Sequence, residues 1–409
     1  MTQAASIAAR TSAPLSRRAL GRAVFSAFAA SLIGIGLSRF AYTPLLPAII
    51  DAHWFKAGAA AYLGAANLAG YLAGALAGRR LAARWLAPRV LCAMMALATL
   101  CFFMSAAPLS FAWFFLWRFL SGLSGGALMV LAAPSVLVHV PPGRRGIVGG
   151  VIFMGVGLGI VASGSLVPLL LAEGLRAAWL GLGALSLLLT LLAWGGWPGE
   201  VPHAATPRNR HAEGAAVRLR ALYAEYALNA AGWVPHMLFL VDFVARGLHD
   251  GEAVGAAYWV LFGIGAMVGP ILAGHVGDRI GFRLAIRFAF IIEIAAILLP
   301  AFSTAPAALI ASSLIVGAFV TGTAVLTLGR IHELLPGQIL RQRAAWSRAT
   351  AGFALLQAGA AYLFSFLFAH WGEDYRLLFL LGAGAMLLAL VIDLVVQRRE
   401  APAATPAHR

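Results

Sequence analysis

Long apolar segments separated by short polar connections run along almost the whole chain. Apolar runs of 18 or more residues are long enough to cross a bilayer as helices, and the sequence contains twelve of them. They lie at residues 20–50, 56–78, 87–106, 109–140, 145–171, 175–197, 220–247, 253–276, 284–302, 304–329, 345–370 and 374–396. The pattern predicts an all-α integral membrane protein with twelve transmembrane helices.

A polar stretch divides these segments into two sets of six. It covers residues 198–219 and contains three prolines and several charged residues, a composition typical of a linker. We therefore expect two six-helix halves at residues 20–197 and 220–397, flanked by tails at 1–19 and 398–409.

The halves carry a weak internal repeat at an offset of 196 residues. Ala60-Ala61-Tyr62 recurs as Ala256-Ala257-Tyr258, and Leu76-Ala77-Gly78 recurs as Leu272-Ala273-Gly274. Such a repeat is typical of transporter folds that bind their substrate near the middle of the bilayer, between the halves.

Glycines at helical spacing predict closely packed helices. The second helix carries Gly70, Gly74 and Gly78 at four-residue spacing, and the fifth is also rich in glycine. Small residues at this spacing let two backbones approach and slide past each other.

Composition and charge agree with a membrane protein. The 409 residues are 61% apolar and 11% charged, which is too apolar for a soluble protein of this size. The net charge of +15 would suit nucleic acid, but the basic residues follow topology instead. If the N-terminus is cytoplasmic, only four of the 30 Lys and Arg residues fall on outer segments (Lys56, Arg176, Arg246 and Arg376), and Arg39 and Arg118 lie within spans. This asymmetry predicts two cytoplasmic termini and argues against nucleic acid as a partner.

Other classes of protein lack support. The first apolar run is too long for a signal peptide, so we expect it to remain as an anchor. The two cysteines, Cys92 and Cys101, lie nine residues apart on one predicted helix and make neither a disulfide nor a metal site. No nucleotide motif is present, so we expect no cofactor and an ion gradient as the energy source.

A short charged segment joins the eighth and ninth predicted helices. It reads GHVGDRIGFR at residues 274–283, where Gly277 and Gly281 permit a sharp turn and the charges cannot enter lipid. The segment resembles the loop motif G-x-x-x-D-R-x-G-x-R of the major facilitator superfamily. The resemblance implies a gating loop formed by five residues: Gly274, Asp278, Arg279, Gly281 and Arg283. The first-half copy, from Gly78, keeps its arginines but has Ala82 in place of Asp278, so an aspartate latch belongs to the second half only.

Three further segments extend the resemblance over residues 20–397. RFLSGLSGGA, from Arg118, looks like the superfamily's arginine-and-glycine motif, whose arginine is implicated in proton coupling. GIGLSRFAYTPLLP (from Gly34) and GWVPHMLFLVDFVARGL (from Gly232) resemble the YbfB/YjiJ branch, a bacterial group with largely unassigned substrates. This implies the major facilitator fold in a bacterial inner membrane, with helices 1, 4, 7 and 10 lining the cavity. The fifth helix lacks the Gly-Pro pair of the antiporter pattern, which weakens an exchange mechanism.

Ionisable groups inside spans are costly and become candidates for function. Arg39 lies in the outer half of the first helix beside Pro44 and Pro47, which favour a bend. Arg118 lies deeper, in the fourth helix. Either arginine could instead cap or brace neighbouring carbonyls, and Arg39 could snorkel to the interface.

The seventh helix carries a polar stripe. Glu225, Asn229, Gly232 and His236 fall at i, i+4, i+7 and i+11 and therefore share one face. The stripe could bind a polar substrate or relay a proton, with His236 as the titrating group. Alternatively, Glu225 pairs with Arg218 or Arg220 and His236 bonds a carbonyl freed by Pro235. Asp242 and Arg246 read as a surface pair, and the pattern offers no account of Glu293.

The charges differ between the halves. The first half places both deep arginines and no acid within spans, whereas the second half places Glu225, Asp242 and Glu293 there. Burying an arginine without a charge partner costs free energy. Arg39 and Arg118 therefore either pair with acids across the cavity and form a gate, or attract an anion.

The sequence thus predicts a monomeric secondary transporter that works in the lipid bilayer. Its expected partners are protons and a small solute, and an organic anion is the candidate class of solute. The alternative is proton-driven efflux of lipophilic or cationic compounds, and a non-transporting sensor of the same fold comes next. An enzyme is not expected, because the GLSGG string at residues 122–126 lacks the strand–turn–helix elbow of a hydrolase. Nothing resembles a channel filter.

Overall fold

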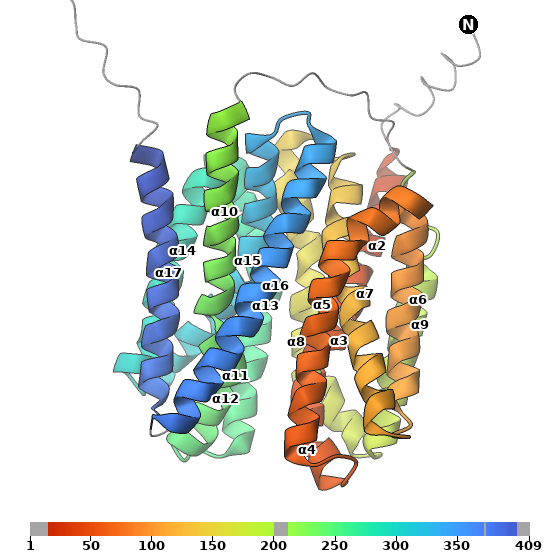
Figure 1. The fold of residues 1–409 in the computed structure, drawn as a ribbon, viewed down its shortest axis with the longest axis vertical. Coiled ribbons are helices and arrows are strands. Elements are labelled where there is room, and N and C mark those ends of the chain that lie inside the picture. The colour runs from red at the N-terminus through yellow and green to blue at the C-terminus, as the bar shows by residue number, and fades with distance from the viewer. Residues whose placement is uncertain (1–14, 200–211, 372–373, 399–409) are drawn as a thin grey trace, which may run out of the picture.

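The computed structural model describes residues 15–199, 212–371 and 374–398, and every regular element in these ranges is a helix (Figure 1). The predicted tails at 1–19 and 398–409 lie largely outside the described residues. Of the predicted linker at 198–219, residues 200–211 are not described and residues 212–219 form the start of a helix.

We call the helices before the linker the N-half. They are α2 (Arg17–Ser31), the π-helix η1 (Leu32–Leu37), α3 (Ser38–Phe40), α4 (Tyr42–Asp51), α5 (Ala57–Trp85), α6 (Ala87–Ser105), α7 (Phe111–Leu137), the 3-10 turn η2 (Pro142–Arg144), α8 (Arg145–Leu171) and α9 (Leu175–Ala193).

The helices after the linker form the C-half. They are α10 (Ala212–Gly232), α11 (Val234–Leu238), α12 (Leu240–Asp242), the π-helix η3 (Phe243–Gly247), α13 (Glu252–Ile280), α14 (Phe282–Phe302), α15 (Pro306–Leu334), α16 (Ile339–His370) and α17 (Tyr375–Arg398). The two groups stand side by side (Figure 1).

Eleven helical segments within the described residues are long and apolar enough to cross a membrane. They coincide with eleven of the predicted spans, with shifts of a few residues at their ends. The remaining predicted span, 56–78, is the first part of α5, a helix of 29 residues that packs along α7.

The start of α2 and the end of α17 lie at the same end of the bundle, at the top of Figure 1. We call it the terminal end: α2 and α10 begin there, and α9 and α17 finish there. The distal end is the opposite one, where α4 meets α5 and α16 is followed by α17.

Glycines bring α5 and α7 into backbone contact, as their spacing predicts. A Cβ atom on Gly70 would lie 1.9 Å from the carbonyl oxygen of Phe119, and one on Gly74 would lie 2.0 Å from that of Leu123. Gly122 and Gly126 of α7 approach α5 equally closely. No side chain fits at these positions unless the two helices separate.

We expect Gly74→Ala to destabilise the protein by roughly 1–3 kcal/mol or more, because overpacking displaces backbone rather than a mobile side chain. Thermal unfolding in detergent measures the effect. Gly384→Ala is the matched control, since a Cβ there meets nothing within 4 Å. Equal melting temperatures for the two variants would contradict the close approach.

The charged segment at residues 274–283 is predicted as a short hinge between spans that end at residue 276 and begin at residue 284, but most of it is helical. Gly274 to Ile280 form the last two turns of α13, and a single residue, Gly281, joins this helix to α14. Gly281 has a φ of +86°, a conformation that favours glycine. The prediction of a sharp turn is therefore right at Gly281 and wrong at Gly277, which is helical.

Candidate functional site

The first and seventh predicted spans are both interrupted. The first passes from α2 into the π-helix η1 and the short α3, then breaks at Ala41 before α4. The seventh is broken twice, between α10 and α11 and between α11 and α12, and it ends with the π-helix η3. Interrupted helices at corresponding places in two halves are the strongest structural pointer to a transport site, and π segments are frequent at functional sites.

A cavity of about 480 Å³ lies between the halves beside these breaks. It lies in the distal half of the bundle and is lined from the N-half by Arg39, Tyr42, Asn67 and Arg118, and from the C-half by Met237 and Tyr362. No Asp or Glu lines it among the described residues. The cavity is therefore apolar, with two positively charged groups in its wall.

Arg118 of α7 is buried beneath this cavity. One guanidinium nitrogen donates to the carbonyl oxygen of Ser38 at 2.9 Å, and the guanidinium carbon lies 4.2 Å from the ring centroid of Tyr42. The Nε atom has no hydrogen-bond partner. The side chain is thus held by neutral groups and retains an unused donor beside the cavity.

Arg39 of α3 crosses from the N-half to the C-half. Its guanidinium donates to Oε1 of Gln357 in α16 and approaches the sulfur of Met237 in α11 at 3.6 Å. The same residue also lines a small pocket of about 30 Å³ with Tyr71, Tyr226 and Trp233. Arg39 and Gln357 therefore form a contact between the halves at the inner limit of the cavity.

The terminal half of the bundle is closed between α16 and the N-half. The indole nitrogen of Trp346 donates to the carbonyl oxygen of Met129 at 3.0 Å. The hydroxyl of Ser347 donates to the carbonyl oxygen of Ala75 at 2.8 Å. All four residues are buried. These contacts close the terminal half, whereas the cavity occupies the distal half.

The carboxylate of Asp278 makes a second closure of the terminal end. It accepts hydrogen bonds from the backbone N–H groups of Gly146 and Ile147, both at 2.9 Å. These are unsatisfied donors in the first turn of α8, where the helix dipole also favours a negative charge. The side chain thus connects the end of α13 in the C-half to the start of α8 in the N-half.

The other predicted gating residues take different positions. Gly274 packs directly on α8, since a Cβ there would lie 2.1 Å from the carbonyl oxygen of Gly146. Arg279 and Arg283 are exposed, and Arg283 borders a small cavity near Glu225. Among the charged residues of this segment, Asp278 is the one whose hydrogen bonds connect it to the N-half at α8.

The polar stripe of the seventh helix faces the interior of the C-half rather than the cavity. Asn229 donates to Oε2 of Glu293 at 2.7 Å and accepts from the hydroxyl of Thr323 at 2.9 Å. All three side chains are buried. The network joins α10, α14 and α15 and provides the partner for Glu293 that the sequence pattern leaves open.

The two ionisable residues of the stripe, His236 and Glu225, lie on either side of this network. His236 is fully buried, and its Nε2 atom lies 2.7 Å from the hydroxyl of Ser312, not against a carbonyl freed by Pro235. Glu225 borders a cavity of about 30 Å³ near the terminal end, together with Arg218, Arg330 and Asp393. The four stripe positions therefore share a face, and that face is turned towards α14, α15 and α17.

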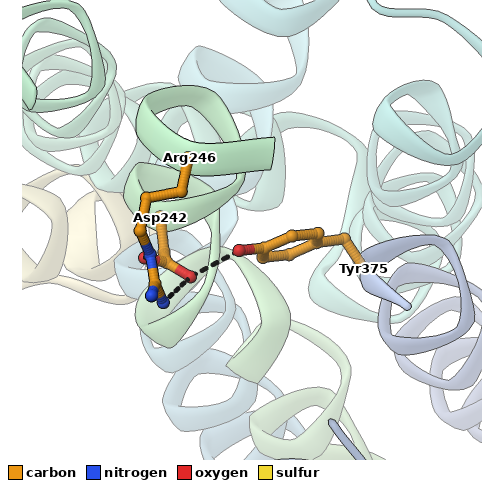
Figure 2. Close-up of polar contacts among 3 residues, drawn as sticks. All are labelled: Asp242, Arg246 and Tyr375. Atoms are coloured by element: carbon orange, nitrogen blue, oxygen red, sulfur yellow. Dashed lines mark hydrogen bonds and ion pairs between the residues drawn. The ribbon is translucent and has the colours of Figure 1, made fainter. Parts of the chain in front are cut away.

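An ion pair lies at the distal end of the C-half (Figure 2). Nη2 of Arg246 donates to Asp242 at 2.6 Å, and the hydroxyl of Tyr375 donates to the same carboxylate oxygen at 2.6 Å. The predicted pairing of Asp242 with Arg246 is confirmed, and Tyr375 adds a connection from η3 and α12 to α17.

Several residues of the site carry no signal in the sequence. Tyr42 and Met237 look like ordinary apolar positions of a span, and their contacts with the two arginines depend on how separate helices pack. Asn67 and Gln357 stand out as polar residues within spans, and both make interhelical bonds: Asn67 donates to the carbonyl oxygen of Arg118 at 3.3 Å.

Comparison with known proteins supports one family and one fold. Residues 31–394 match the family described as uncharacterised MFS-type transporter YbfB, where MFS stands for major facilitator superfamily. A comparison with curated proteins finds no significant sequence match.

Three solved structures share the architecture. The proton:xylose symporter XylE, solved with 6-bromo-6-deoxy-D-glucose, has a TM-score of 0.72 at 14% identity over 93% of this chain and 96% of its own. The human organic anion transporter MFSD10 has a TM-score of 0.70 at 17% identity, covering 91% and 99%. FucP in its outward conformation has a TM-score of 0.68 at 15% identity, covering 91% and 98%.

Proposed function

Because the chain belongs to the major facilitator superfamily, in the family of the MFS-type transporter YbfB, we propose that it moves a small solute by alternating access between its two halves. The placement of the cavity supports this mechanism. The cavity of about 480 Å³ between the halves lies in the distal half of the bundle, and side chains connect the halves in the terminal half. Transport would require these contacts to break while the distal end closes.

We propose that the terminal end faces the cytoplasm of a bacterial cell. The excess of basic residues on the segments at that end supports this orientation. The arrangement described here is then the outward-facing one, in which the cavity of about 480 Å³ serves the external side of the inner membrane.

We propose that the transported solute carries a carboxylate or another anionic group. The observation that supports this is the pair of guanidinium groups in the cavity wall without an acidic partner among the described residues. Arg39 contacts the neutral amide of Gln357 across the cavity. The alternative, in which Arg39 pairs with an acidic residue of the other half to form a gate, is therefore not supported. An anion in the cavity would supply the missing charge.

We propose that transport is coupled to protons through Glu225, with Asn229 and His236 as positioning residues within the C-half. Glu225 is buried and borders a cavity of about 30 Å³, large enough for water, near the terminal end. The charged groups that border the same cavity are Arg218 from α10, Arg283 from α14, Arg330 from α15 and Asp393 from α17, and Arg287 of α14 bonds to Asp393. Protonation of Glu225 would change the charge balance of this cluster and with it the packing of four helices.

We expect Glu225→Gln to reduce pH-gradient-driven accumulation at least tenfold while leaving downhill exchange of the solute intact, because the amide keeps the shape but cannot titrate. Glu293→Gln is the matched comparison, since Glu293 is fully buried, is bonded to Asn229 and does not line the cavity beside Glu225. If Glu293→Gln abolished coupling and Glu225→Gln did not, the assignment to Glu225 would be wrong.

The function is tested by uptake into proteoliposomes under an imposed pH gradient, against a panel of small carboxylates, neutral solutes and lipophilic cations. Saturable, gradient-dependent accumulation of a carboxylate is the expected result. Movement of lipophilic cations instead would support an efflux pump in which the arginines act only as a gate. Failure of every class to move in either direction would favour a non-transporting sensor.

A further inference from the structure

The internal repeat provides a comparison within the chain for the Asp278 closure. An offset of 196 residues relates Asp278 to Ala82 in α5, and relates Gly146 and Ile147 to Gln342 and Arg343 near the start of α16. In the second-half pair, a carboxylate on α13 accepts from the first turn of α8. In the first-half pair, the helix that should carry the carboxylate has a methyl group instead.

A cavity occupies the position of the missing carboxylate. It has a volume of about 320 Å³, and its lining includes Ala82 of α5 together with Leu340 and Arg343 of α16. At the corresponding position of the second half, the carboxylate of Asp278 accepts from Gly146 and Ile147. The first-half copy therefore has a cavity between α5 and α16, the elements that correspond to α13 and α8 in the repeat.

The chemistry of the lining fits an anion. Arg79 and Arg343 both border the space, the hydroxyl-bearing Ser347 lies on the same wall, and no Asp or Glu contributes among the described residues. Two guanidinium groups from opposite halves favour a group with several oxygen acceptors, and the start of the 32-residue α16 adds the positive end of its dipole.

The surroundings place this space at the edge of the bundle. Trp85 and Leu86, where α5 ends, and Leu340, where α16 begins, are about half exposed or more (54%, 49% and 61%). Exposed aromatic and aliphatic residues beside arginines are typical of the headgroup level of a bilayer. A phosphate group can reach such a position either from a lipid headgroup or from solution.

We propose that this cavity binds a phosphate group, which takes the place of the missing carboxylate and joins α5 to α16 at the terminal end. The bound group would contact Arg79 from the N-half and Arg343 from the C-half, so its binding favours the arrangement in which the terminal end is closed. The site regulates conformation and is separate from the transport cavity, which lies in the distal half. Its existence does not depend on the identity of the transported solute.

The binding test uses the full chain in neutral detergent and two probes, inorganic phosphate and a short-chain phosphatidylglycerol, with the short-chain phosphatidylcholine as the zwitterionic reference. We expect titration calorimetry to detect binding of at least one anionic probe to the wild type. Ala82→Asp should weaken that binding at least tenfold, because its carboxylate enters the site and repels the anion. Arg343→Gln should weaken it as well. Arg84→Gln, which removes a charge that lies over Trp85 outside the cavity lining, should leave it unchanged.

A second measurement follows the closure itself. Spin labels at the exposed positions 85 and 341, in a background lacking Cys92 and Cys101, report the separation of α5 and α16. We expect a saturating concentration of the anionic probe to increase the population with a short distance between the labels at least fivefold in the wild type. Ala82→Asp should show the same increased population when no anionic probe is added. If phosphatidylglycerol causes this change and inorganic phosphate does not, the ligand is a lipid. If inorganic phosphate causes the change equally well, the ligand is a soluble anion. Equal binding by the wild type, Ala82→Asp and Arg343→Gln, or no binding of either probe by the wild type, would overturn the proposal.

Discussion

Replacing Arg39 or Arg118 with glutamine is expected to weaken binding of a carboxylate-bearing solute by about 10- to 150-fold for each substitution. The range follows from the roughly 1.5–3 kcal/mol that a hydrogen bond to a charged group contributes. Glutamine keeps a donor and much of the volume, so the loss would report the missing charge rather than a collapsed site. The affinity of the purified protein for the solute, measured by titration calorimetry, checks this result directly.

The two substitutions are expected to differ in their effect on conformation. Arg118→Gln leaves the contact between Arg39 and Gln357 in place, because Arg118 bonds within the N-half to Ser38. Arg39→Gln removes the contact between the halves and should also shift the balance between closed and open forms. An effect on solute affinity common to both, with a conformational effect for Arg39→Gln alone, would separate binding from gating.

A matched control is available at the distal end. Arg376 is exposed, lies over the ring of Phe302 at 5.1 Å and does not border the cavity. Arg376→Gln removes the same charge from the protein and should leave affinity within twofold. If all three variants bound the anion as tightly as the wild type, the arginines would have no role in substrate binding.

The apolar pattern predicts the helices well because each span is dictated by its own composition. Eleven predicted spans coincide with candidate membrane helices, and Gly70 and Gly74 make the backbone contacts that their spacing predicts. The turn at Gly281 is also local, since its positive φ is a property of one residue. Features that depend only on a segment of about 20 residues, such as a membrane helix or a glycine turn, can therefore be predicted from that segment.

The orientation of each helix about its axis depends on its neighbours and is much harder to predict from the sequence. The spacing of Glu225, Asn229 and His236 places them on one face but does not say which helices that face meets; Asn229 and His236 meet Glu293 and Ser312 within the C-half. The π segments η1 and η3 have no period of their own in the sequence. The partner of Asp278 lies more than 130 residues away in the chain, so only the packed structure identifies it.

The second large effect is expected from Asp278→Asn, which should open the terminal end. The amide keeps the size of the carboxylate but loses the charge that interacts with two N–H donors and the dipole of α8. An N-terminal cap contributes about 0.5–2 kcal/mol, and the dipole adds up to about 1 kcal/mol for a partly exposed charge. The ratio of closed to open forms should therefore fall by roughly 2- to 150-fold.

Spin-label distances across the terminal end of α8 and α13 measure this ratio, with Asp374→Asn as the control. Asp374 also caps a helix, since its carboxylate accepts from the N–H of Leu377 at 3.2 Å, but it does so at the distal end and within the C-half. A general loss of helix stability would affect both variants, whereas a latch between the halves would respond only to Asp278→Asn. If the distances were unchanged in Asp278→Asn, closure would depend on the buried contacts of Trp346 and Ser347 with the N-half, and Asp278 would serve only as a cap for α8.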